Sequence, residues 1–318
     1  MLESLRSAFP SLTVQAGAAL AHHTTFKIGG ACRALVPVTD DGTLAELAGH
    51  LSEGRVPHIM IGGGSNLLFD SSGYEGIVVK NLVSWIRRSG DRIEASGGCD
   101  LQDLLRFSLD EGLAGLEFAA GIPGTFGGGL AGNAGAYGAN LGEILESASI
   151  LDDRGRAREV AREYFEFAYR RSRIQRTGEI ILSARIRLSP CVNLAASRSR
   201  CDEILASREA KHPHAGMPSA GSFFKNLDRF DDSGKRIPAG LLLDKVGCKG
   251  LRIGNAQVYE KHANIIVNLG GATSSEVLTL AAEMRRRVLE SFGVALEPEV
   301  RFVPRGREEQ SEPNREMR

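Results

Sequence analysis

Two glycine-rich segments constrain this chain more than any other feature of its sequence. The first, Gly62-Gly63-Gly64-Ser65-Asn66, directly follows the apolar run Ile59–Ile61. Glycine tolerates positive φ and lets a ligand approach the backbone, so successive N–H groups can converge on one anion. The segment predicts a pyrophosphate site at the end of a strand, with a plain turn as the alternative.

The second segment covers residues 121–138 and holds eight glycines in eighteen positions. Proteins on average contain only about 7% glycine. Ile122, Pro123, Phe126 and Tyr137 are interleaved with these glycines, which a flexible linker does not need. The composition favours backbone packed against a large flat ligand, and a linker is the alternative.

Two common nucleotide motifs are absent from both segments. No Gly-Lys-Ser/Thr follows either segment, and neither forms a well-spaced G-x-G-x-x-G with an acidic residue about twenty positions later. The sequence therefore disfavours a P-loop and an ordinary Rossmann fold, although it remains compatible with nucleotide binding.

Charge and cysteine content narrow the function classes. The 39 basic residues balance the 39 acidic residues, so no whole-molecule field attracts nucleic acid or an anionic membrane. The five cysteines form no C-x-x-C pair, and the histidines show no metal-site spacing. We expect free thiols in a reducing cytoplasm, no metal and no membrane span, and no obligate protein partner is evident.

Local patterns predict alternating strands and helices. Apolar residues recur at every second position from 180 to 188, namely Ile180, Leu182, Ala184, Ile186 and Leu188, and the run ends before Pro190, which predicts a half-buried strand. Thr43 and Glu46 predict a capping box for a helix ending at Gly54. Thr273 and Glu276 predict a second box, for a helix over 274–292 that stops at Gly293. The other expected helices are 100–111, 193–210 and 239–246, and the other expected strands are 35–38, 56–61, 77–79, 264–268 and 300–303.

Eight stretches, including parts of both glycine-rich segments, carry a resemblance to a known family. They follow one another along the chain as residues 23–30, 62–68, 115–124, 133–138, 169–173, 220–226, 261–264 and 296–301. On these motifs, from about Thr24 to Val303, the chain resembles the UDP-N-acetylenolpyruvoylglucosamine reductases, or UDP-N-acetylmuramate dehydrogenases. Eight ordered segments are far more specific than any single one.

The resemblance implies an α+β fold, with a two-lobed FAD-binding domain of the vanillyl-alcohol-oxidase (PCMH) type and a smaller C-terminal α+β substrate domain. We expect an N-terminal extension over 1–21, the FAD domain over 22–190, the substrate domain over 191–304 and a charged, disordered tail over 305–318. The boundary near 190–200 also follows from Pro190 and the polar stretch after it.

The implied reaction is an NADPH-dependent reduction of UDP-N-acetylglucosamine enolpyruvate to UDP-N-acetylmuramate through FAD, which serves peptidoglycan precursor synthesis. The alternatives are another FAD oxidoreductase of the same cofactor fold, acting on an alcohol or hydroxy acid, and a non-catalytic nucleotide-binding protein. The arginine, serine and glutamate positions of the family are all occupied in this chain, which argues against both.

By resemblance, three residues are catalytic. Arg170 matches the arginine that holds the enolpyruvyl carboxylate, Ser222 matches the proton donor, and Glu299 matches the active-site glutamate. Glu297 lies two positions earlier, on the same face of an extended segment, and only the resemblance distinguishes it from Glu299. Lys225 is near enough in sequence to polarise Ser222.

The remaining predicted site residues fall into two groups. The cofactor group is Gly62, Gly63, Gly64, Ser65, Asn66, Gly121, Ile122, Pro123, Gly124, Gly128, Asn133, Ala134 and Gly135. The substrate group is Tyr169, Lys225, Asn226, Lys261, His262 and Asn264. The chain departs from the family pattern at Leu227, where proline is usual, and at Tyr259, where serine is usual.

Overall fold

The computed structural model describes residues 2–152, 154–214 and 216–306. Most of the predicted charged tail, residues 307–318, lies outside these residues. The chain divides into two compact units: Met1–Ala16, Ala34–Gly63 and Gly76–Arg208 form the first, and Gly17–Arg33, Gly64–Glu75 and Glu209–Arg318 form the second. Neither unit is continuous in sequence, and the predicted domain limits at 21, 190 and 304 stay a prediction.

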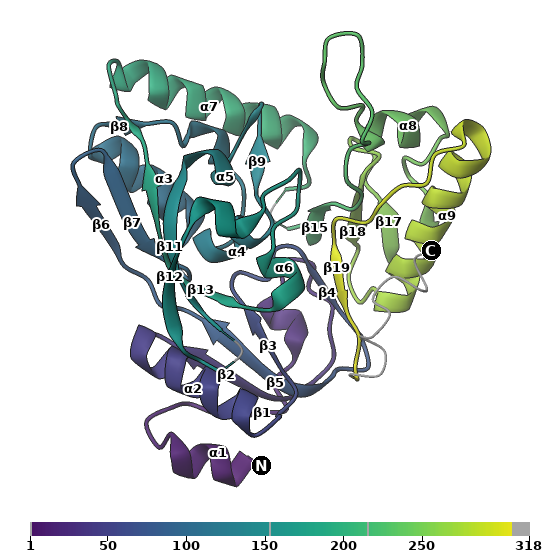
Figure 1. Ribbon diagram of the computed structural model, residues 1–318. Helices are drawn as coiled ribbons and strands as arrows, with labels where there is room; N and C mark the ends of the chain where they lie inside the picture. The colour runs from purple at the N-terminus through teal and green to yellow at the C-terminus, as the bar shows by residue number, and fades with distance from the viewer. Residues whose placement is uncertain (1, 153, 215, 307–318) are drawn as a thin grey trace. The chain divides into compact units, whose positions relative to one another are not determined.

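A four-stranded sheet in the order β1-β2-β5-β3 contains the strand that leads into the first glycine segment (Figure 1). The helix α2 (Asp41–Glu53) connects β2 to β3 and packs Leu44, Leu47 and Leu51 onto this sheet. The strands are β1 (Gln15–Ala16), β2 (Cys32–Val38), β3 (His58–Ile61) and β5 (Tyr74–Asn81). β3 is parallel to β5 and ends at Ile61, so Gly62 lies directly after its carboxyl end.

The predicted capping box of α2 is wrong. Asp40 is the N-cap, and its carboxylate accepts a hydrogen bond from the Thr43 amide at 2.8 Å. An aspartate three residues before Thr43 is as good a cap as a threonine, and it satisfies the first-turn amides earlier. The helix therefore begins at Asp41 and includes Thr43.

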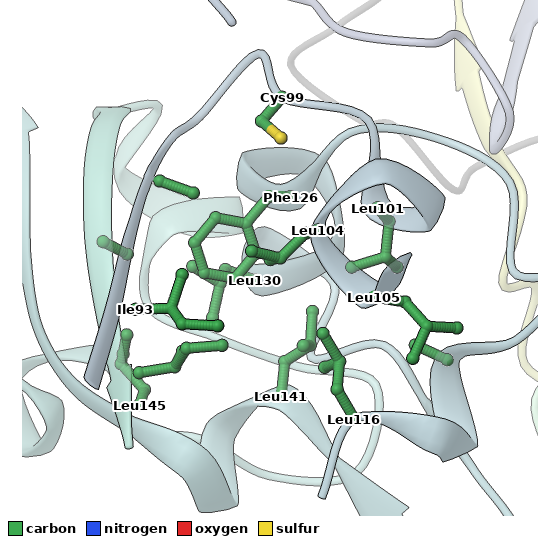
Figure 2. Packing of buried hydrophobic residues seen from close by; sticks show 14 of the residues in the cluster. Ile93, Cys99, Leu101, Leu104, Leu105, Leu116, Phe126, Leu130, Leu141 and Leu145 are labelled. Carbon is green, nitrogen blue, oxygen red and sulfur yellow. The ribbon is translucent and has the colours of Figure 1, made fainter. Parts of the chain in front are cut away.

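A five-stranded antiparallel sheet in the order β12-β11-β13-β7-β6 forms the second half of the first unit. Its strands are β6 (Ile86–Ser89), β7 (Arg92–Ser96), β11 (Leu145–Leu151), β12 (Ala157–Ala161) and β13 (Ile180–Arg187). The alternation over 180–188 correctly predicted β13. The sheet's inner face, including Ile93 and Leu145, packs against α3 and α4 (Figure 2).

The helix predicted over 100–111 is confirmed as α3 (Leu101–Asp110). Asp100 is its N-cap, and its carboxylate accepts a hydrogen bond from the Gln102 amide at 2.8 Å. Its apolar side chains Leu101, Leu104 and Leu105 point into the same core as Phe126 of α4 (Figure 2). The other elements are α1 (Leu2–Ala8), β8 (Leu113–Ala114), α4 (Phe126–Ala131), β9 (Gly135–Ala136), β10 (Ala139–Asn140), α5 (Leu141–Ile144), α6 (Ile174–Thr177), β14 (Ser189–Pro190) and α7 (Leu194–Lys211). Short 3-10 helices occur at Glu117–Ala119 and Arg162–Phe165.

The second unit is built on an antiparallel sheet in the order β15-β18-β17-β16. The long helix α9 (Ser274–Phe292) covers β16 and β17 and buries Val277, Leu280 and Met284 (Figure 1). The remaining elements are β4 (Leu67–Phe69), β15 (Ser219–Ser222), α8 (Ala239–Lys245), β16 (Arg252–Ile253), β17 (Ala256–Val258), β18 (Ile265–Asn268), β19 (Arg301–Val303) and a 3-10 helix at Leu20–His23. Within the described residues, no helix combines the length and apolarity that crossing a membrane requires.

Candidate functional site

The beginning of the first glycine segment packs against the second segment inside the first unit. A Cβ atom on Gly62 would lie 2.2 Å from the Thr125 Oγ1, and one on Gly63 would lie 3.0 Å from the Gly124 Cα. Any side chain at either position would therefore push the two segments apart. Within the first unit, the backbone of Gly62 and Gly63 therefore lies directly beside Gly124 and Thr125.

The rest of the first segment belongs to the second unit. Gly64 has a φ of +65°, and a Cβ atom there would lie 2.2 Å from the His23 carbonyl oxygen. The Asn66 side chain donates a hydrogen bond to the Glu299 carbonyl at 3.0 Å. Thr25 donates through its hydroxyl to the Ser219 carbonyl at 2.8 Å. The loop is thereby tied to the two segments that carry Ser222 and Glu299.

The turn that opens the second segment is held by one amide side chain. Gln102 accepts a hydrogen bond from the Gly121 amide at 2.8 Å and donates to the Ala119 and Ile122 carbonyls at 2.9 and 2.8 Å. Thr125 then caps α4. Sequence reasoning missed both Gln102 and Thr125, because only their contacts with distant backbone reveal their roles.

The first loop fits the diphosphate of FAD. Among the described residues, the backbone amides of Gly63 and Gly64 donate to no protein acceptor, and Gly63 is exposed. Successive amides of this kind are the donors that a phosphate group needs. The backbone around Gly62 and Gly124 is also packed so closely that no Cβ atom fits at Gly62, which is why glycine is needed there. Gly63 and Gly64 would hold the diphosphate here.

Arg170 is fixed to the second glycine segment within the first unit. Its Nη2 donates to the Gly135 carbonyl at 2.8 Å and its Nη1 donates to the Asn133 carbonyl at 3.5 Å. The residue adopts a φ of +53°, and its guanidinium carbon lies 5.3 Å from the centre of the Tyr169 ring. The predicted active-site arginine and the predicted cofactor residues Asn133 and Gly135 thus lie together.

The side chain of Asn133 itself braces the segment. It donates to the Ala168 carbonyl at 2.9 Å and accepts from the Gly142 amide at 3.0 Å. Ala134 donates its amide to Gly129, so the chain between α4 and β9 is held by its own hydrogen bonds. This bracing keeps the glycine-rich backbone in one conformation despite its composition.

Ser222 lies directly after a bulge in β15. Ser219 pairs with Val267 and Ser222 pairs with Ile265, so three steps along β15 match two along β18. Gly221 takes up the irregularity with a φ of +74°. Bulges commonly redirect a side chain beside an active site. The glycine before Ser222 therefore has a conformational reason, beyond the plain turn that the sequence also allowed.

The segment of Glu297 and Glu299 runs beside the residues that follow Ser222. The Glu299 amide donates to the Phe223 carbonyl at 2.8 Å, and the Lys225 amide donates to the Glu297 carbonyl at 2.9 Å. The Lys225 ammonium also forms an ion pair with the Glu297 carboxylate at 2.6 Å. The structure thus gives the Glu297 carboxylate a cationic partner that the sequence could not reveal.

Two of the predicted substrate residues hold the local backbone. Asn264 is buried, accepts from the Phe224 amide at 2.9 Å and donates to the Phe224 carbonyl at 2.8 Å. Asn226 accepts from the amide of Ala239, the first residue of α8, at 3.3 Å. Both asparagines therefore position the Ser222–Asn226 stretch, and their contact with substrate stays a prediction.

His262 and Lys261 differ in exposure. Burial lowers the pKa of His262, and the neighbouring charges of Lys249 and Lys211 act in the same direction, so the neutral imidazole is favoured. Its ring packs edge-on against His212, with centroids 5.6 Å apart. Lys261 is exposed and available to an anion.

The departure at Leu227 has a structural explanation. Its amide donates a hydrogen bond to the Ile237 carbonyl at 3.0 Å, and its side chain is buried in the core of the second unit. A proline at this position could not donate that bond.

For metals, no group of three or more His, Cys, Asp or Glu residues with suitable placement occurs in the described part of the chain.

Comparison with known proteins covers both units. The family model "FAD binding domain" matches residues 32–161, and "UDP-N-acetylenolpyruvoylglucosamine reductase, C-terminal domain" matches residues 212–303. These matches confirm the predicted fold class, in which an FAD-binding domain precedes a C-terminal α+β domain.

Whole-length relatives carry one name. The UDP-N-acetylenolpyruvoylglucosamine reductase of Heliobacterium modesticaldum is 40% identical over 89% of this chain and 88% of that protein. That of Gloeobacter violaceus is 39% identical over 92% and 97%. The crystal structure of the enzyme from Thermus caldophilus has a TM-score of 0.76 and 30% identity, covering 92% of this chain and all of that one. The chain therefore belongs to the UDP-N-acetylenolpyruvoylglucosamine reductase family.

Proposed function

We propose that this protein reduces the enolpyruvyl group of UDP-N-acetylglucosamine enolpyruvate with NADPH, giving UDP-N-acetylmuramate for peptidoglycan synthesis. The observation that carries the proposal is the joint presence of an FAD-binding domain and this family's C-terminal domain in a chain 40% identical to a named reductase. Five free cysteines favour a reducing compartment, and we place the reaction in the cytoplasm.

The overall change adds a hydride and a proton across the carbon–carbon double bond of the enolpyruvyl group and converts NADPH to NADP⁺. FAD, when bound, carries the hydride between the two substrates. The protein must then hold the substrate carboxylate, stabilise the negative charge that develops beside it and deliver one proton to carbon.

Three side chains are proposed for these tasks. Arg170 has a permanently charged planar guanidinium, which suits an enolate-like carboxylate. Ser222 is half-buried after the Gly221 bulge and donates the proton from its hydroxyl. Glu299, anchored through its amide to Phe223, orients the carboxyl end of the substrate. UDP binds through its diphosphate, for which exposed Lys261 is the proposed cation.

Ser222→Ala tests the proposal directly. The variant should bind FAD, and NADPH should bleach its flavin absorbance as in the wild type. The reason is that Ser222 acts only after NADPH has been oxidised, when the enolpyruvyl group is reduced. Turnover of the enolpyruvyl nucleotide should fall about 100- to 10,000-fold, the usual contribution of a positioned acid. The measurements are the visible flavin spectrum, single-turnover reduction and steady-state kcat.

Ser219→Ala is the matched control, since Ser219 lies on the same strand as Ser222. Its described hydrogen bond, from the Thr25 hydroxyl, goes to its backbone carbonyl, which the substitution keeps. This variant should retain near-wild-type turnover. Full turnover by Ser222→Ala would remove Ser222 as the proton donor. A purified wild-type protein that cannot be reconstituted with FAD would contradict the proposed function itself.

A further inference from the structure

Arg208, near the end of α7, differs from the other arginines of that helix. Arg198 forms an ion pair with Asp110 at 2.7 Å and Arg200 forms one with Glu203 at 3.0 Å. For Arg208, the residues that the structure describes supply neither an ion pair nor a hydrogen bond. Burial lowers its pKa, and Tyr137 is the group that acts in the opposite direction. Its charge is therefore partly desolvated and lacks a carboxylate partner in the described chain.

The side chain of Arg208 lies across the turn that begins the second glycine segment. A Cβ atom on Gly121 would be 2.9 Å from the Arg208 Cδ and 3.0 Å from its Nε. Gly121 has a φ of +71°, and its amide is already held by Gln102. Both features constrain the conformation of the turn. The Nε atom of the Arg208 guanidinium lies directly beside the backbone of Gly121.

This position makes Arg208 a binding group for an anion. Taking a guanidinium out of water is costly unless a partner supplies opposite charge and hydrogen-bond acceptors. A diphosphate supplies both, because two oxygens of one phosphate can accept the two parallel N–H groups of the planar arginine fork. We propose that Arg208 binds the diphosphate of FAD beside the turn of residues 121–124.

The proposal rests on the proposed function, because it takes FAD as the cofactor. NADPH and the UDP-sugar also contain diphosphates. FAD is favoured because the 121–124 turn continues into Gly124 and Thr125, which pack against Gly62 and Gly63 of the other predicted cofactor loop. Arg208 would add a full positive charge to a site otherwise made of backbone amides.

The test measures the Kd of apoprotein for FAD by flavin fluorescence. Arg208→Gln should raise the Kd about 10- to 100-fold, as expected for the loss of one charge-assisted hydrogen-bonding group. The Kd of Arg208→Lys for FAD should lie between those of the wild type and Arg208→Gln. Riboflavin, which has no phosphate, should bind the wild type and Arg208→Gln equally. Arg198→Gln is the control on the same helix and should leave the Kd for FAD unchanged.

Each outcome has a distinct meaning. If the wild type binds no FAD, the proposed function fails. If the wild type binds FAD and Arg208→Gln binds it within twofold, the role of Arg208 is overturned while the function stands. Equal weakening for riboflavin would show a structural defect instead. An unchanged Kd for FAD with a raised KM for NADPH or the UDP-sugar would assign Arg208 to that diphosphate and overturn the FAD assignment.

Discussion

Gly64 has two reasons to be glycine, and they can be separated by experiment. Its φ of +65° is strained for any other L-residue, and a Cβ atom would lie 2.2 Å from the His23 carbonyl oxygen. Gly90, in the turn between β6 and β7, has the same φ of +65°, yet a Cβ atom there would have nothing within 4 Å. The pair isolates close backbone approach from conformational strain.

Gly64→Ala should therefore destabilise the protein more than Gly90→Ala. Gly90→Ala should cost about 1–2 kcal/mol, which is the penalty of the left-handed conformation alone. Gly64→Ala should exceed this, and it should also weaken FAD binding because its amide moves. The free energy of unfolding in urea and the Kd for FAD check both points. Equal costs for the two variants would contradict the close approach.

At the scale of elements, α9 is the best-defined helix of the second unit. Thr273 accepts from the Glu276 amide at 3.2 Å, and the Glu276 carboxylate accepts from the Thr273 amide at 2.8 Å. Gly293 ends the helix with a φ of +63°. Both ends confirm the sequence prediction, because capping boxes and left-handed glycine caps depend only on residues within one turn.

Thr273→Ala should lower the stability of the protein by about 1 kcal/mol, since it removes a side-chain cap from the helix that covers β16 and β17. Ser275→Ala, in the first turn but outside the box, should change stability by less than about 0.5 kcal/mol. Thermal and urea unfolding provide the measurement. A cap variant as stable as Ser275→Ala would show that packing alone fixes the start of α9.

At the scale of the whole molecule, the family assignment and the FAD-binding domain confirm that the protein is an FAD-dependent oxidoreductase. Its five cysteines are free and are distributed over both units. Burial raises the pKa of the Cys32, Cys99 and Cys248 thiols to about 11, which suppresses the reactive thiolate.

Alkylation with iodoacetamide at pH 8 should therefore label Cys191, which is partly exposed, well before these three thiols. Their labelling should be slower than in the unfolded chain by about two orders of magnitude, since a thiol pKa near 8.5 returns on unfolding. Labelling of the three should also accelerate as the pH rises toward 11. Peptide mass spectrometry follows each cysteine, and Cys191→Ser should lose only the fast label. Rapid labelling of Cys99 in the native protein would contradict its burial.

The sequence by itself determined what depends on neighbouring residues: the alternation that makes β13 a strand, both ends of α9, and the location of the glycine segments. It also carried enough family-specific motifs to predict the family. The tertiary structure alone decided which distant groups meet. It brought Gly62 against Thr125, paired Lys225 with Glu297, and laid Arg208 across Gly121. Local patterns cannot encode these contacts, because each joins segments tens of residues apart or more, whose approach depends on the packing of the elements between them.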